Sequence, residues 1–176
     1  MTAISTQWEA VWEGARASAH TIVIGESLAP LTPGDLQMSW VGCDAGWSAR
    51  DPLGEALRRV EKLLGEDAPL PAWLFDDLPA QSMEVRFVEA CNRLAEWTGC
   101  NVVVGFQALD AADEATITML MQILRHPTCL RLPVILTIQR VTQGPISELI
   151  DVLRHAAGDA AIVELHGRLQ PLEPCY

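Results

Sequence analysis

The chain has 176 residues, of which 49% are hydrophobic and 20% are charged, a balance typical of one compact domain spanning residues 1–176. Its formal net charge of −11 repels phosphate backbones and argues against a sequence-independent nucleic-acid partner. No apolar run reaches the roughly 20 residues that cross a bilayer, and the start lacks a basic region followed by an apolar one. We therefore expect a cytoplasmic protein without a nucleic-acid or membrane partner.

The amino-terminal segment, residues 1–19, predicts a helix that runs from about Ala3 to Ala19. Trp8 and Trp12 lie four residues apart and share one face with other apolar residues at helical spacing. Such a stripe usually belongs to a protein core, but tryptophan is also enriched at interface hot spots. The sequence leaves both alternatives open, a core role and a partner surface.

Beyond this segment, β-branched or apolar runs alternate with amphipathic ones. In chain order we expect strand 20–25, strand 36–43, helix 52–64, helix 82–98, strand 100–106, helix 114–126, strand 132–139, helix 145–157 and strand 160–167. The alternation predicts an α/β fold with a mostly parallel five-stranded sheet and helices on both faces. Within it we expect Val85 to point inward from its helix. Cys91, Cys100 and Cys129 lie in apolar stretches and read as small core residues.

The connection between the first two predicted strands is unusually short. It reads GESLAPLTPGD (25–35), eleven residues that include Pro30 and Pro33. A parallel crossover usually needs a dozen or more residues and a helix, and prolines disfavour a helix here. We therefore expect the crossover helix to be missing.

A second connection, residues 66–81, is punctuated by prolines and contains Trp73 and Phe75 beside two aspartates. Its mixture of aromatic, apolar and acidic residues suits a loop that docks onto a partner. The same residues also suit a packed connection between two helices. Both interpretations stay open.

The stretch FQALDAADEATITMLMQILRHPTCLRLPVILTIQR (106–140) resembles the second half of the ATPase domain in STAND-type signalling ATPases, within the wider AAA+ group. It keeps the turn and helix start as Ala112-Asp113-Glu114-Ala115-Thr116, and a strand led by Leu-Pro. Arg140 falls where the family often has an arginine, and CDAG (43–46) is similar to the family's turn after the second strand. The resemblance implies a P-loop NTPase-like sheet.

The residues that perform the family's chemistry are missing. In this register the two acids that hold Mg²⁺ and activate water correspond to Gln107 and Ala108, which carry no negative charge. The phosphate loop G-x-x-x-x-G-K-[ST] is replaced by the segment 25–35. The chain has one lysine, Lys62, far from that segment. We expect the Walker A loop and its helix to be lost, and no catalytic residue to remain.

The resemblance implies a non-catalytic adaptor or protein-interaction module in bacterial signalling or defence, with an active ATPase or signalling component as partner. The five cysteines are widely spaced without a CxxC pair, and we expect neither a metal nor a cofactor. Two alternatives remain. One is nucleotide binding without hydrolysis, for which Arg140 and Arg50 are the available cations. The other is a small α/β enzyme that uses Asp110, Asp113 and Glu114, a cluster expected at the carboxyl end of a central strand.

Overall fold

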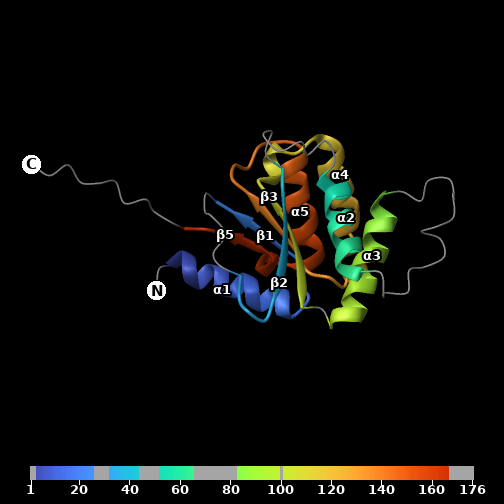
Figure 1. Ribbon diagram of the computed structural model, residues 1–176. Coiled ribbons are helices and arrows are strands. Elements are labelled where there is room, and N and C mark those ends of the chain that lie inside the picture. Colours follow the sequence, from blue (N-terminus) through green and yellow to red (C-terminus); the bar gives the residue numbers. More distant parts are fainter. Residues whose placement is uncertain (1–2, 26–31, 44–51, 66–82, 100, 167–176) are drawn as a thin grey trace, which may run out of the picture.

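The computed structural model describes residues 3–25, 32–43, 52–65, 83–99 and 101–166 (Figure 1). Its helices are α1 (Ala3–Arg16), α2 (Pro52–Leu64), α3 (Met83–Thr98), α4 (Glu114–Leu124) and α5 (Pro145–Ala157). Its strands are β1 (Thr21–Ile24), β2 (Gln37–Gly42), β3 (Val102–Gln107), β4 (Val134–Ile138) and β5 (Ile162–Glu164). In the described part of the chain, the short 3-10 turns η2 (Leu109–Ala111), η3 (Pro127–Cys129) and η4 (Asp159–Ala161) lead into or out of these elements.

The five strands form one sheet in the order β2-β3-β4-β1-β5, and every neighbouring pair is parallel. β3, β4 and β1 lie inside the sheet and consist almost entirely of buried apolar residues. Parallel strands covered on both faces need such continuous apolar runs. The predicted α/β class and parallel five-stranded sheet are therefore confirmed.

The two faces of the sheet are covered unequally. One face packs against α2, α3, α4 and α5, which together bury the larger core cluster. The other face packs against α1, through Trp8, Val11, Trp12 and Ala15. In Figure 1, α1 lies across the sheet from the other four helices. Helices therefore cover both faces, as predicted, but one face depends on α1.

The tryptophans of α1 belong to this smaller core. Trp8 is 2% exposed and Trp12 is 4% exposed, and their ring centroids lie 5.5 Å apart. They pack over Val103 of β3 and Ile135 of β4. Of the two alternatives that the sequence left open, the structure favours the core role.

The connection from β1 to β2 shows no helix in its described part, Gly25 and residues 32–36; residues 26–31 lie outside the described structure. Leu36 is 8% exposed and joins the core cluster of α1. Asp35 forms an ion pair with Arg16 at the end of α1, with an N···O distance of 2.6 Å. The end of this connection therefore lies on the same side of the sheet as α1.

Two predictions for single residues are wrong. Val85 is 43% exposed, because α3 buries Phe87, Ala90, Cys91 and Leu94 instead. Cys129 is also exposed, whereas Cys91 is buried as predicted. Cys100 and the connection 66–81 lie outside the described residues. None of the described helices is long and apolar enough to cross a bilayer.

Candidate functional site

The carboxyl edge of the sheet is where an α/β protein usually binds its ligand. At the end of β3, Gln107 is half-buried and Ala108 is buried. Ala108 has φ 53° and ψ 50°, a left-handed conformation that is uncommon for a residue with a side chain. Its N–H donates to Thr137 Oγ1 of β4 at 3.0 Å. The chain thus turns out of the sheet at Ala108, directly after Gln107.

The carboxylates beyond this turn have local structural partners. Asp110 Oδ1 accepts the Gln139 N–H at 2.9 Å, which joins η2 to the end of β4. Asp113 occupies the N-cap position of α4 but makes no side-chain cap hydrogen bond. Its carboxylate accepts the hydroxyl of Thr116 instead. Each acid therefore holds a turn in place.

The structure describes only some of the remaining sequence candidates. Glu114 and Arg140 are exposed, and in the described part of the chain Arg140 forms no ion pair. Arg50, Trp73 and Phe75 lie outside the described residues. Across the described residues, no group of three or more His, Cys, Asp or Glu is placed to hold a metal ion.

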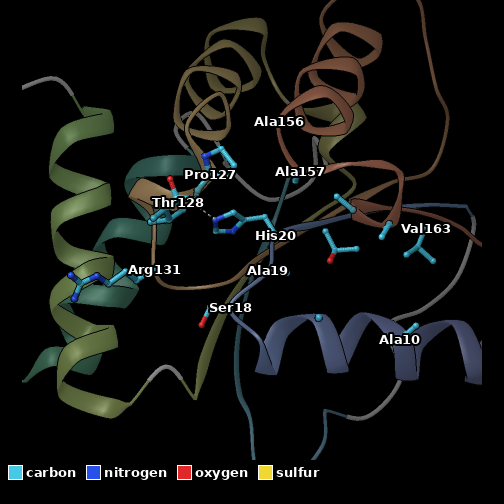
Figure 2. A pocket seen from close by; sticks show the side chains of 15 residues that line it. Ala10, Ser18, Ala19, His20, Pro127, Thr128, Arg131, Ala156, Ala157 and Val163 are labelled. Carbon is cyan, nitrogen blue, oxygen red and sulfur yellow. Dashed lines mark hydrogen bonds between the residues drawn. The ribbon is translucent and has the colours of Figure 1, made fainter.

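A cavity of about 800 Å³ lies at the opposite, amino edge of the sheet, between α1, η3 and the end of α5 (Figure 2). Its walls are mostly small apolar side chains, including Ala10, Ala19, Ala157 and Ala161. Sequence reasoning missed this cavity, because its walls come from segments far apart in the chain. The one local signal is the run of small residues at 156–161.

His20 lies in the wall of the cavity, directed toward Pro127 (Figure 2). Its Nδ1 accepts the Val134 N–H at 3.1 Å, so the ring proton resides on Nε2, which donates to Pro127 O at 2.9 Å. Burial lowers the pKa of His20, since the charged form would lose its hydration. His20 is therefore a neutral structural link between the starts of β1 and β4, with no ring nitrogen left for a ligand.

The cavity presents little charge. Arg131 lines it, but its side chain points away toward α3 (Figure 2) and pairs with Glu96 at 3.0 Å. The hydroxyl-bearing wall residues are Ser18, Thr21 and Thr128. These walls suit an apolar group.

No protein-family model matches the chain, and no curated protein matches it. The inference of function therefore depends on the residues and on their arrangement.

Proposed function

We propose that this chain is a P-loop-like domain that has lost its ATP chemistry and acts through protein contacts. The role follows from the resemblance to STAND-type ATPases within the AAA+ group. Such a pseudo-ATPase works as an adaptor beside an active ATPase or another signalling component in bacterial signalling or defence.

The strand order supports the resemblance. β1 lies between β4 and β5, and β4 separates β1 from β3. This is the order in which the ATPase group arranges its core strands, so that the loops after the first and third strands flank one nucleotide. Gly25 directly follows the end of β1, and Gln107 is the last residue of β3.

The observation that carries the proposal is the position of α1. From β2 through β3 and β4 to β5, each successive strand lies further toward the same edge of the sheet. The helices between these strands all pack on one face. The step from β1 to β2 runs in the opposite direction. Because crossovers keep one hand, a helix in that step would lie on the other face. That face is occupied by α1, an element that precedes β1 in the chain.

The space for a phosphate-binding helix is thus filled by a helix from elsewhere in the sequence. Trp8 and Trp12 complete the core on that face, so the fold needs no nucleotide to be complete. At the carboxyl edge, Asp110 and Asp113 accept hydrogen bonds from Gln139 N–H and the Thr116 hydroxyl. These bonds give each of the two carboxylates a structural role at this edge.

Titration calorimetry with Mg-ATP and with Mg-ADP tests the proposal. We expect no binding heat at about 1 mM nucleotide, which corresponds to a free energy of binding weaker than about −4 kcal/mol. Micromolar binding that is lost in Arg140→Ala would contradict this and favour the nucleotide-binding alternative. Gln139→Ala is the matched control, because Gln139 is the exposed neighbour of Arg140. This variant keeps the backbone N–H that donates to Asp110.

A further inference from the structure

The sheet has two edge strands, β5 and β2, and they are covered differently. β5 has three residues, and the side-chain amide of Gln7 binds its outer side. Gln7 Nε2 donates to Glu164 O at 2.6 Å, and Gln7 Oε1 accepts the His166 N–H at 3.1 Å. A further strand would make the same two bonds. Gln7 therefore closes this edge against another chain.

β2 is longer, with six residues. The Gln37 N–H donates to Asn101 O, and the Cys43 N–H donates to Gln107 O, so the odd-numbered residues face β3. The N–H and C=O groups of Met38, Trp40 and Gly42 therefore point away from the sheet. Among the described residues, one side chain binds them: Arg59 donates to Trp40 O.

β2 itself carries none of the usual protective devices of an edge strand. Its sequence QMSWVG contains no charge and no proline, and it pairs with β3 without a bulge. Natural edges commonly use one of these devices to prevent pairing with another chain. Met38 and Trp40 lie over Gly105 of β3 and are partly exposed. The open backbone groups thus adjoin an apolar flank.

Positive charge collects beside this edge in a chain of net charge −11. Arg58, Arg59 and Lys62 share one face of α2 with Glu55, at helical spacing. Glu55 pairs with both arginines, so this face carries three cations and one anion. Since Arg59 reaches Trp40 O, the face lies along β2. The charge favours an acidic partner and disfavours a second copy of this chain, which would bring two such faces together.

We propose that β2 receives an extended acidic segment of a partner protein as a sixth strand. The inference rests on the proposed adaptor function and names its partner's chemistry. Side chains of an added strand alternate between the faces of the sheet. Acidic residues on the α2 side meet Arg58 and Lys62, and apolar residues on the other side meet Trp40. An N–H of the segment replaces Arg59 as the donor to Trp40 O. The released Arg59 side chain then pairs with a carboxylate of the segment.

Amide hydrogen exchange with a capped peptide of alternating valine and glutamate tests this inference. We expect the peptide at about 1 mM to slow exchange of the Trp40 and Gly42 amides about tenfold. The same peptide with lysine in place of glutamate, or with N-methylated amides, should have no effect. Met38→Pro removes one outward N–H, which an edge strand tolerates, and should abolish the protection. Met38→Ala, which loses the side chain but keeps the N–H, should retain it.

Three results would overturn the inference: no protection by the acidic peptide, equal protection by the lysine peptide, or protection that Met38→Pro leaves intact. Concentration-dependent dimerisation that Met38→Pro abolishes would assign the edge to a second copy and also refute it. None of these results bears on nucleotide binding. The calorimetric test of the proposed function therefore succeeds or fails separately.

Discussion

Three side chains replace backbone partners at places where the chain leaves regular structure. Asn92 donates to Cys129 O and accepts the Arg131 N–H, both at 2.8 Å. Gln7 makes the same pair of bonds at Glu164 O and His166 N–H. His20 joins Pro127 O to the Val134 N–H with its two ring nitrogens. Each connects residues far apart in the sequence by satisfying groups that would otherwise lack a partner.

We expect Asn92→Ala to lower the free energy of unfolding by about 1 kcal/mol, because it leaves Cys129 O and the Arg131 N–H without this partner. Asn92→Asp is the matched control that removes only the donor. Its carboxylate still accepts the Arg131 N–H but repels the Cys129 carbonyl, so Asn92→Asp should be at least as destabilising as Asn92→Ala. Urea unfolding measures both variants. Wild-type stability in Asn92→Ala would show that the link contributes nothing.

The buried His20 makes stability depend on pH. Its pKa is lowered in the folded chain, so the unfolded chain binds the proton more readily. His20 therefore contributes fully above its unfolded pKa of about 6.5. This contribution is lost as the pH falls below that value, with a slope of at most about 1.4 kcal/mol per pH unit.

Urea midpoints measured from pH 8 to pH 5 check this expectation. His20→Gln should unfold more easily at every pH and lose the part of the slope that His20 causes. His155→Gln, at an exposed position, should keep the wild-type slope. An identical slope in the wild type and His20→Gln would contradict the assignment to His20.

At the scale of elements, hydrophobic periodicity identified each α-helix and strand that the structure describes, and the bounds of α5 were predicted without error. Val85 was misplaced because it lies two residues before Phe87, about 200° around the helix axis. Periodicity alone did not show which of the two apolar stripes of α3 is buried. Contact with the rest of the core decides it in the structure. The predicted strand 160–167 includes the last two residues of η4 as well as β5. Apolar composition alone does not separate the turn from the strand.

The packing of β2 on β3 depends on Gly105. A Cβ at this position would overlap the ring of Trp40 and the terminal methyl of Met38. We expect Gly105→Ala to lower the free energy of unfolding by about 1–3 kcal/mol, the usual cost of overpacking. Gly42→Ala is the matched control in the adjoining strand, because a Cβ there meets no described atom within 4 Å. Equal stability of the two variants would contradict the packing of Trp40 over Gly105.

At the scale of the whole molecule, the sequence predicted that the crossover helix is missing, a prediction that falls partly on residues 26–31, outside the described structure. It did not predict that α1 covers this face of the sheet. α1 meets β3 and β4 through contacts between residues about a hundred positions apart, such as Trp8 with Val103 and Ile135. Local pattern carries no information on such pairs. The cavity beside His20 was missed for the same reason, since α1, η3 and α5 form it together.

The core role of the α1 tryptophans has a direct consequence for stability. Trp12→Ala should lower the free energy of unfolding by about 3–5 kcal/mol, because it leaves a large hole in the smaller core. Trp97→Ala is the matched control, since Trp97 is 51% exposed on α3, and should change stability little. Denaturant unfolding compares the two variants. A mild effect of Trp12→Ala would mean that α1 does not complete the sheet face.

The central claim is that this P-loop-like domain performs no ATP chemistry. Phosphate release from Mg-ATP by the purified protein tests it most directly, measured beside Asp110→Asn. Asparagine keeps an oxygen that accepts the Gln139 N–H, so this variant should fold as the wild type does. We predict no release above the buffer blank from either protein. Release by the wild type that Asp110→Asn abolishes would contradict the claim and establish an enzyme.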